Sequence, residues 1–432
     1  MHSKIVIVGG GAGGLELACK LGRKLGPDQV MLVDCRLYHI WKPSLHEVAA
    51  GTLDIHQEGL SYQMLAHDNG FTYVYGALTA LDAAARRVTV GAVLGPSRET
   101  VLPERRVGYD ALVLAIGSTA NYFGVPGAQQ YTVALNATED AEQFRLRLLK
   151  LLTEAELRKE HEADAGVDIV IIGGGATGVE LAAELREASG VYLSYGFRQL
   201  QALKDVRITL LEGAPRILAP LPEKVSTAAL RLLDERAIKV VTETRVTAIG
   251  ARDVTVADGT VYAADICVWA AGIKAPAVLV GLGLPLTRSG QIDVDGGLAV
   301  RGHPNIYALG DCAACVDANG TSVPPRAQAA HQQADYVRAI LLAQAAGKAP
   351  PAKAYVYRDY GSLVSFGHSS TVGSLMGSLK GLSWFVDGFI ARLMYVSLHL
   401  MHHQAVLGTV RTGVLALARF LIKRSRPLVK LH

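Results

Sequence analysis

Cysteine is scarce in this chain of 432 residues. The five cysteines are odd in number and scattered, at Cys19, Cys35, Cys267, Cys312 and Cys315. This arrangement is unlike a disulfide framework and predicts a reducing compartment. The strand pattern MHSKIVIVGG starts the sequence and leaves no room for a cleavable signal, so we expect neither export nor organelle import.

Charged residues are also few, at 19% of the chain, whereas half of the residues are apolar and the mean hydropathy is +0.25. This balance is apolar for a wholly soluble protein, so we expect part of the surface to meet lipid. Asp387, Arg392, Arg411 and Arg419 interrupt the apolar stretches near the C-terminus, and no stretch predicts a membrane-spanning helix. The net charge of only +4 gives nucleic-acid binding no support.

Two segments of the chain read almost as copies of each other. They are KIVIVGGGAGGLELACKL, from Lys4, and DIVIIGGGATGVELAAEL, from Asp168. Each combines an apolar strand pattern, a glycine turn and a helical pattern, and a second strand pattern then ends in an acid, Asp34 or Glu212. The sequence therefore predicts an α/β fold with two Rossmann-like dinucleotide-binding domains.

The first glycine motif has the pattern of a phosphate-binding turn. Its glycines allow a tight turn, the close approach of a pyrophosphate and close helix packing, and the following helix points its N-terminus at the anion. Asp34 follows Gly14 by 20 residues, the spacing at which a carboxylate accepts hydrogen bonds from an adenosine ribose. The predicted nucleotide contacts are Gly9, Gly11, Ala12, Gly13, Gly14 and Asp34.

The second glycine motif repeats this pattern, although Glu212 follows Gly178 by 34 residues. No Arg directly follows Glu212 to receive a 2′-phosphate, so NADH is favoured over NADPH. The alternative is that Glu212 is only a charge at a strand end. The predicted contacts are Gly173, Gly175, Ala176, Thr177, Gly178, Glu212, Ala271 and Gly272. Two nucleotide sites in one chain indicate electron transfer between two dinucleotides.

A third pattern, NIYALGDCA, runs from a short strand into Gly310 and Asp311. The following PPRAQAAHQQADYVRAIL predicts a helix with Pro325 near its first turn. The partial positive charge at that helix N-terminus suits an anionic reduced flavin, and Asp311 suits a ribityl chain. From the residues alone, however, this is a strand, a loop and a helix.

Together these motifs resemble flavoproteins with two dinucleotide-binding domains, in which the first motif binds FAD and the second binds NAD(P)H. HIWKPSLHEVAAGTLD from His39, PPRAQAAHQQ from Pro324 and GSLVSFGHSSTVGSLMG from Gly361 further resemble the bacterial type II NADH:quinone oxidoreductases, over essentially the whole chain. The resemblance implies bound FAD, NADH as a substrate and electron transfer to a membrane quinone such as ubiquinone in a respiratory chain, without proton pumping.

The resemblance also implies limits for the domains. The FAD-binding domain is expected at residues 1–120 and 276–345, with the NADH-binding domain at 121–275 inserted between its two parts. Residues 346–432 are expected to form a C-terminal membrane-associating region.

Particular residues receive roles from the same resemblance. Glu180 corresponds to a glutamate near the nicotinamide and the flavin, although it also fits a helix cap or an ion pair. Gln328 and Gln332 are expected beside the flavin and the quinone, and core helix packing is their alternative. The further flavin contacts are Lys42, Gly117, Gly310, Asp311 and Ala327. Ile116 departs from the family, in which many members carry threonine.

Two rival functions depend on Cys312-x-x-Cys315, which has the spacing of a redox pair or of half a metal site. A sulfide:quinone oxidoreductase needs reactive cysteines that flank the flavin, and no thiol after Cys315 supplies a partner. The other rival is a flavin-bound redox or metal-binding protein. We favour a structural role for the pair and read Tyr395, His399, His402 and His403 as packing or interfacial residues, so no metal site is predicted.

The C-terminal segments LSWFVDGFIARLMYVSLHLMHH and VRTGVLALARFLIKRSRPLVK combine apolar helical patterns with sparse charge. We expect them to lie in the surface of a bilayer, which makes the protein peripheral on the cytoplasmic face of the bacterial cell membrane. The expected basic edge comprises Arg411, Arg419, Lys423, Arg424, Arg426 and Lys430, with Trp384 and Tyr395 as interfacial anchors. A homodimer interface or a cover over the flavin domain is the alternative.

Overall fold

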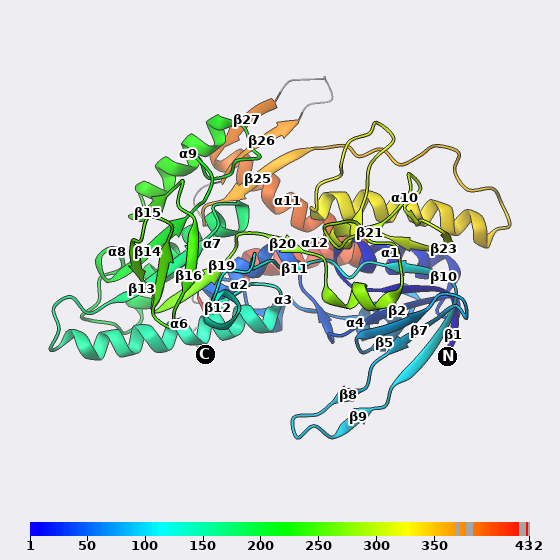
Figure 1. The fold of residues 1–432 in the computed structure, drawn as a ribbon, viewed down its shortest axis with the longest axis horizontal. Helices are drawn as coiled ribbons and strands as arrows, with labels where there is room; N and C mark the ends of the chain where they lie inside the picture. Colours follow the sequence, from blue (N-terminus) through cyan, green and yellow to red (C-terminus); the bar gives the residue numbers. More distant parts are fainter. Residues whose placement is uncertain (368–370, 377–382, 423–428, 431–432) are drawn as a thin grey trace.

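The computed structural model describes residues 1–367, 371–376, 383–422 and 429–430. Figure 1 shows two lobes, each built around a twisted sheet, with the C-terminal helices lying between them. The N-terminus belongs to one lobe, and Lys430 lies beside the other, where it pairs with Glu142.

The first lobe contains a sheet in the order β22-β23-β10-β1-β2-β5, in which β23, β10, β1, β2 and β5 run parallel. The central strands β1 and β2 are almost continuous buried apolar runs, as parallel strands covered on both faces usually are. The bounds are β1 (His2–Val8), β2 (Val30–Asp34), β5 (Thr72–Tyr75), β10 (Arg105–Leu114), β22 (Ala299–Val300) and β23 (His303–Ala308).

Helices cover the first sheet, and a β-hairpin extends it. β6 (Leu78–Asp82) and β7 (Arg87–Val90) pair with each other, and β7 also pairs antiparallel with β10. The principal helices are α1 (Ala12–Leu25), α4 (Tyr62–Asn69) and α10 (Ala327–Ala345). α10 begins two residues after Pro325, so the proline lies before the first turn and not within it.

The second lobe repeats the arrangement with the order β12-β19-β13-β14-β15, in which all strands are parallel. The prediction of two Rossmann-like units is therefore confirmed. The elements are β12 (Thr132–Val133), β13 (Val167–Ile172), β14 (Val206–Leu211), β15 (Ile238–Val241), β19 (Ile266–Trp269), α6 (Thr138–Lys159), α7 (Ala176–Ser194) and α9 (Glu223–Asp234).

Two short strands connect the lobes: β11 (Thr119–Ala120) leaves the first lobe, and β20 (Ile273–Lys274) returns to it. They pair antiparallel, so the chain crosses between the lobes twice at the same place. α2 (Leu45–Ala50) comes from the first lobe but packs in the core of the second, against α6 and α7.

The C-terminal part adds a small antiparallel sheet and two helices. The order is β25-β26-β27, and α11 and α12 follow. Their bounds are β25 (Gly361–Ser365), β26 (Thr371–Met376), β27 (Ser383–Asp387), α11 (Gly388–Leu407) and α12 (Thr409–Ile422).

The remaining elements are short and lie mostly at the edges of the lobes. Those before the second lobe are β3 (Tyr38–His39), η1 (Lys42–Ser44), α3 (Ile55–Glu58), β4 (Leu60–Ser61), β8 (Val93–Leu94), β9 (Thr100–Leu102) and α5 (Ala128–Tyr131). Those after it begins are α8 (Ala202–Asp205), β16 (Val246–Ile249), β17 (Asp253–Val256), β18 (Val261–Ala263), η2 (Ala277–Leu282), β21 (Ile292–Asp293), η3 (Gly310–Cys312) and β24 (Ala313–Ala314).

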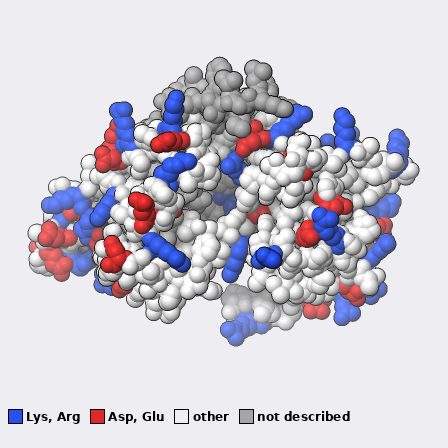
Figure 2. All heavy atoms as spheres, turned by 45° about the horizontal axis from the view of Figure 1, so that its top comes forward, with Lys and Arg blue, Asp and Glu red and all other residues white. Residues whose placement is uncertain are grey.

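On the face shown in Figure 2, basic and acidic side chains are interspersed over both lobes, in keeping with the near balance of charge in the sequence. Within the part of the chain that the structure describes, no helix combines the length and the apolar character needed to cross a bilayer.

Candidate functional site

The first glycine turn joins β1 to α1 and leaves space for a ligand. Gly9 has φ +102°, and a Cβ there would lie 2.4 Å from the carbonyl oxygen of Ala115. A Cβ on Gly14 would lie 1.9 Å from the carbonyl oxygen of Gly9, so the helix packs directly on the turn. A Cβ on Gly11, in contrast, would meet nothing within 4 Å. Open space at Gly11, together with close packing at Gly9 and Gly14, fits a turn that receives a pyrophosphate.

The N-terminus of α1 is available to an anion. Gly11 is the N-cap, and no side chain caps the helix. Asp34 ends β2 beside it, accepts the Gly10 N–H at 2.6 Å and the Arg36 N–H at 2.8 Å, and thereby fixes the turn. Burial raises the pKa of the Asp34 carboxyl. Gly13 closes the turn on its other side, because a Cβ there would lie 2.8 Å from the carbonyl oxygen of Ala330 in α10.

The second glycine turn, between β13 and α7, has the same geometry. Gly173 has φ +110°, a Cβ on Gly178 would lie 2.0 Å from the carbonyl oxygen of Gly173, and a Cβ on Gly175 would meet nothing within 4 Å. Glu212 accepts the Gly174 N–H at 2.5 Å and the Ala214 N–H at 2.7 Å, as Asp34 does in the first turn. The longer spacing in sequence therefore leaves the carboxylate in an equivalent place.

The other predicted contacts of the second site lie next to this turn. Ala176 and Thr177 open α7, whose N-terminus has no side-chain cap. Ala271 and Gly272 follow β19, and a Cβ on Gly173 would lie 2.6 Å from Ala271 Cα. The structure thus brings together the residues that the sequence assigned to this turn.

A second polar cluster lies beyond the first turn, where β10 and β23 end. Ser118 Oγ donates to Asp311 Oδ2 at 2.7 Å, and Lys42 Nζ donates to the Ser118 carbonyl at 3.1 Å. Gly117 and Gly310 have φ +68° and +71°, so both chains turn in the left-handed region. The structure brings Lys42, Gly117 and Asp311 together through Ser118. The sequence argument did not name Ser118, although Ser118 directly follows Gly117.

Gly310 is also held by α10. Its N–H donates to Gln333 Oε1 at 2.7 Å, and Gln333 is buried. Ala327 opens α10, so the first turn of this helix carries Ala327 and Gln328. Gln333 was missed because a glutamine inside an apolar helical pattern gives no signal of its backbone partner.

Gln328 and Gln332 both bind the segment that leads into β25. The Gln328 amide donates to Asp359 Oδ1 at 3.2 Å and to the Gly361 carbonyl at 3.1 Å, and it accepts the Tyr360 N–H at 3.3 Å. Gln332 donates to the Arg358 carbonyl at 2.8 Å and accepts the Arg358 N–H at 3.0 Å. The two amides therefore attach the C-terminal part to the first lobe.

Glu180 is buried in α7, where the two lobes and β25 meet. Its Oε1 accepts the Ser365 N–H at 3.1 Å, and its Oε2 lies 3.8 Å from His46 Nδ1. Burial raises the pKa of Glu180 to about 7, although His46 and the Ser365 N–H oppose the shift. Glu180 is thus a carboxyl that exchanges its proton near neutral pH.

His46 completes this cluster, and the sequence argument gave it no role. Burial lowers the pKa of His46, but the carboxylates of Glu180, Glu47 and Glu184 outweigh burial, and the net shift is upward. Its Nε2 is buried without a hydrogen-bond partner among the described residues. Its presence in the HIWKPSLHEVAAGTLD segment was the only available signal.

Cys312 and Cys315 are not joined by a disulfide. All five are free thiols, and Cys312 and Cys315 are buried. Burial raises the pKa of each of these two thiols to about 11, so neither is a thiolate at neutral pH. This weighs against sulfide chemistry and against a thiolate metal site. Across the described residues, no three or more His, Cys, Asp or Glu side chains are grouped to hold a metal ion.

Comparison with known proteins gives consistent results. Residues 3–334 match the family described as pyridine nucleotide-disulphide oxidoreductase. The type II NADH:quinone oxidoreductase of Haemophilus influenzae is 37% identical over 99% of both chains. The type II NADH:quinone oxidoreductase Ndh of Mycobacterium tuberculosis is 30% identical over 92% of this chain and 84% of its own.

Among solved structures, NDH2 from Plasmodium falciparum in complex with NADH has a TM-score of 0.83, covering 99% of this chain and 100% of that one. At 19% identity it shows the shared fold. Together with the two glycine turns, these matches show that the chain belongs to the pyridine nucleotide-disulphide oxidoreductase family and, within it, to the type II NADH:quinone oxidoreductases.

Proposed function

We propose that this chain oxidises NADH and passes the electrons through bound FAD to a membrane quinone of a respiratory chain, without pumping protons. The observation that carries the proposal is the repeated glycine turn, with its uncapped helix N-terminus and its strand-end carboxylate, in a chain that is 37% identical over its length to a type II NADH:quinone oxidoreductase. Two dinucleotide sites in one chain suit the transfer of electrons from one dinucleotide to the other.

FAD is assigned to the first turn, with the domain limits 1–120 and 276–345, and NADH to the second, within 121–275. Gly11 supports the first assignment, since the space beside it is open and the helix behind it lacks a cap. The cluster of Lys42, Ser118 and Asp311 would hold the part of FAD beyond the pyrophosphate. When bound, the flavin supplies the chemistry that accepts a hydride from NADH.

The chain's own residues place the two substrates and manage protons. Asp34 and Glu212 fix the two glycine turns and present carboxylate oxygens for ribose hydroxyls. Glu180, with its pKa near 7, is assigned to the meeting place of nicotinamide and flavin as a group that gains and loses a proton. Gln328 and Gln332 are assigned to the quinone side, where they hold residues 358–361 in place.

Steady-state turnover with NADH and a short-chain quinone tests the activity. We expect flavin bleaching on addition of NADH and recovery of its absorbance on addition of quinone. Activity with sulfide as the donor, together with an unreduced flavin in the presence of NADH, would contradict the proposal.

We also propose that α11 and α12 attach the protein to a lipid surface. Val410, Val414, Leu417 and Leu421 are exposed, and at about 100° per residue they fall within about 60° of one another on α12. On α11, Leu393, Val396, Leu398 and Met401 are exposed as well. An exposed apolar stripe on a helix that is too short to span a bilayer suits insertion into the headgroup region.

The arginines of α12 do not form the expected lipid-facing edge. Arg411 pairs with Asp68, and Arg419 pairs with Glu58, so both point to the first lobe. Lys430 is partly buried and pairs with Asp54 at 3.1 Å and Glu142 at 3.4 Å. Lys423, Arg424, Arg426 and the side chain of Trp384 lie outside the described residues. The proposed attachment therefore depends on the apolar stripe. We place the attached protein on the cytoplasmic face of the membrane.

Leu417→Asp tests this attachment, and Thr227→Asp on the exposed side of α9 is the matched control. We expect Leu417→Asp to keep FAD and activity with a soluble quinone but to lose most co-sedimentation with liposomes, because a charge in the stripe opposes burial. Undiminished co-sedimentation would contradict the proposal. A halved mass in solution, with liposome binding unchanged, would instead assign the stripe to a homodimer.

A further inference from the structure

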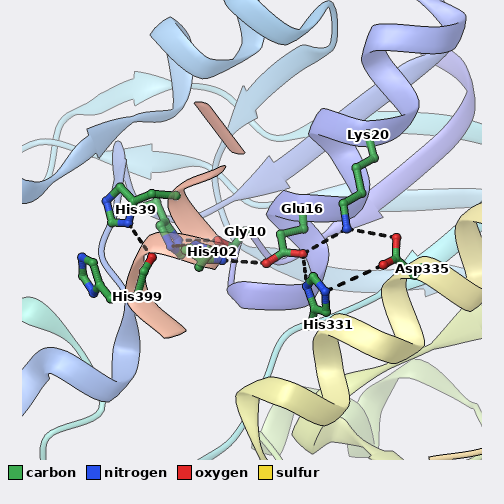
Figure 3. Close-up of polar contacts among 9 residues, drawn as sticks. Gly10, Glu16, Lys20, His39, His331, Asp335, His399 and His402 are labelled. Carbon is green, nitrogen blue, oxygen red and sulfur yellow. Dashed lines mark hydrogen bonds and ion pairs between the residues drawn. The ribbon is translucent and has the colours of Figure 1, made fainter. Parts of the chain in front are cut away.

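A buried chain of hydrogen bonds joins helix α11 to the first glycine turn (Figure 3). His39 Nδ1 lies 2.9 Å from the carbonyl oxygen of Gly10, and His39 Nε2 lies 2.8 Å from His402 Nε2. His402 Nδ1 in turn lies 2.8 Å from Glu16 Oε1. The three side chains are at most 4% exposed, so water does not satisfy them.

These three contacts require three protons. The Gly10 carbonyl can only accept, so His39 Nδ1 carries a proton. A second proton lies between the two imidazoles, and a third lies between His402 and Glu16. Two neutral imidazoles and an ionised carboxylate supply only two protons. His39, His402 and Glu16 together therefore hold one proton more than two neutral imidazoles and an ionised carboxylate would hold.

The surroundings place the extra proton. Glu16 Oε2 faces Lys20 Nζ at 3.3 Å and accepts from His331 Nδ1. Burial opposes the charge on Glu16, but the hydrogen bonds from His331 and His402 outweigh it and lower the pKa of Glu16 to about 2. Burial also keeps the pKa of His39 well below its ordinary value. An ionised Glu16 and a neutral His39 leave the extra proton on His402.

We propose that His402 is a positioning residue for FAD, a buried imidazolium that joins α11 to α1 and fixes the first glycine turn through His39. This inference rests on the proposed placement of FAD at that turn. The proton on His402 Nε2 makes His39 Nε2 an acceptor, so His39 is the tautomer whose Nδ1–H donates to the Gly10 carbonyl. The Tyr62 hydroxyl donates to the same oxygen at 2.7 Å.

Loss of the extra proton breaks one contact, since His402 Nδ1 would then face Glu16 with two lone pairs opposed. The connection therefore weakens as pH rises. Glu16 is the carboxylate in direct contact with His402, and the Trp41 ring packs on the imidazole at 4.4 Å between centroids. The other titratable or charged groups around this cluster are Lys20 and Arg23 on α1, His331 and Asp335 on α10, His399 and His403 on α11, and Arg419 on α12.

Glu16→Gln separates the charge from the hydrogen bonds. The amide NH₂ of this variant donates to His402 Nδ1, and the amide oxygen still accepts from His331 and Lys20. Every contact is then satisfied by a neutral His402, so the variant needs no extra proton. His402→Leu instead removes the connection altogether and leaves His39 Nε2 without its partner.

The experiment measures protonation and FAD affinity separately. In the histidine-labelled holoprotein at pH 7, we expect the ¹⁵N NMR signals of His402 to show both nitrogens protonated in the unmodified protein and one in Glu16→Gln. The His402 signals are identified by their absence from His402→Leu. FAD dissociation constants are measured from pH 6 to 9 by flavin fluorescence.

We expect the unmodified protein to lose about tenfold in FAD affinity as pH rises, since one buried contact is then left unsatisfied. Glu16→Gln should bind FAD with little pH dependence, and His402→Leu should bind it about tenfold more weakly throughout. His331→Gln is the matched control, because it changes the outer histidine and keeps the contacts between His39, His402 and Glu16. The pH dependence of its FAD affinity should follow that of the unmodified protein.

A singly protonated His402 in the unmodified protein, or the same pH dependence in Glu16→Gln, would overturn the inference. If His402→Leu does not fold, Glu16→Gln and the NMR spectrum still decide it. Gly11→Val tests the placement of FAD independently, because it should block the turn whatever the charge on His402. Retained FAD affinity in Gly11→Val would refute the placement and leave the protonation result standing.

Discussion

Replacing Glu180 by Gln should make the protein more stable at high pH and not at low pH. The carboxyl is 7% exposed, and burial raises its pKa from 4.5 to about 7. The folded state therefore holds this proton more tightly than the unfolded state does. Stability consequently falls as pH rises from about 4.5 to about 7, by about 1.4 kcal/mol per pH unit. The upper limit of this cost is about 3 kcal/mol, reached above pH 7.

His46, the histidine beside Glu180, does not reverse this result. Its raised pKa, caused by Glu180, Glu47 and Glu184 against the effect of burial, contributes stability that is complete below its ordinary value of 6.5 and is lost as pH rises. At low pH Glu180 is neutral and only Glu47 and Glu184 supply that contribution, so Glu180→Gln leaves it unchanged there. The difference in stability between Glu180→Gln and the unmodified protein should thus increase steadily from pH 5 to pH 8.

Thermal unfolding with excess FAD at pH 5 and pH 8 measures this difference. For a chain of 432 residues the entropy of unfolding is about 0.9 kcal/mol/K, so 3 kcal/mol corresponds to about 3 °C in Tm. Glu235→Gln on the surface of the second lobe is the control, since its exposed ion pair with Arg231 contributes little to stability. A Tm difference for Glu180→Gln that stays constant between the two pH values would refute the argument.

Three further predictions concern the substrate sites. Glu212→Gln should raise the KM for NADH about tenfold and reduce the preference for NADH over NADPH, because a neutral amide cannot accept both turn N–H groups. Asp34→Asn is the matched change in the first turn and should leave the KM for NADH unchanged. Asp311→Ala should weaken FAD binding about tenfold in an equilibrium titration, whereas Asp311→Asn should lose less. Gln328→Leu should slow flavin reoxidation by quinone more than flavin reduction by NADH in stopped-flow traces, and equal slowing would remove Gln328 from the quinone side.

The glycine turns and their strands were predictable because the information is local. A turn that must admit a pyrophosphate needs glycine at fixed spacings, and a buried parallel strand needs an apolar run on both faces. Asp34 and Glu212 could be found for the same reason, since each ends the strand beside its turn. The longer connection before Glu212 did not prevent this prediction, because the strand pattern before Glu212 ends in an acid as the one before Asp34 does.

The polar contacts between distant segments could not be predicted. Glu16 looks like an ordinary charge on the helix after the first turn, and its partner His402 lies 386 residues later. Arg411 and Arg419 read as a lipid-facing edge, because nothing near them in sequence reveals Asp68 and Glu58. Pairings of this kind depend on how packed elements meet, and no local pattern encodes that.

The two sides of α11 and α12 differ in character, and this would link the proposed lipid attachment to the first glycine turn. The inner side places His402 against Glu16 and the α12 arginines against acids of the first lobe. The outer side carries the apolar stripe. If the helices left the first lobe to enter lipid, Glu16 would lose its contact with His402, and Asp68 and Glu58 would lose their arginine partners, which is unfavourable. Under the proposed lipid attachment, the helices would meet a membrane while still docked, so a change that loosens His402 should alter both FAD affinity and the presentation of the stripe.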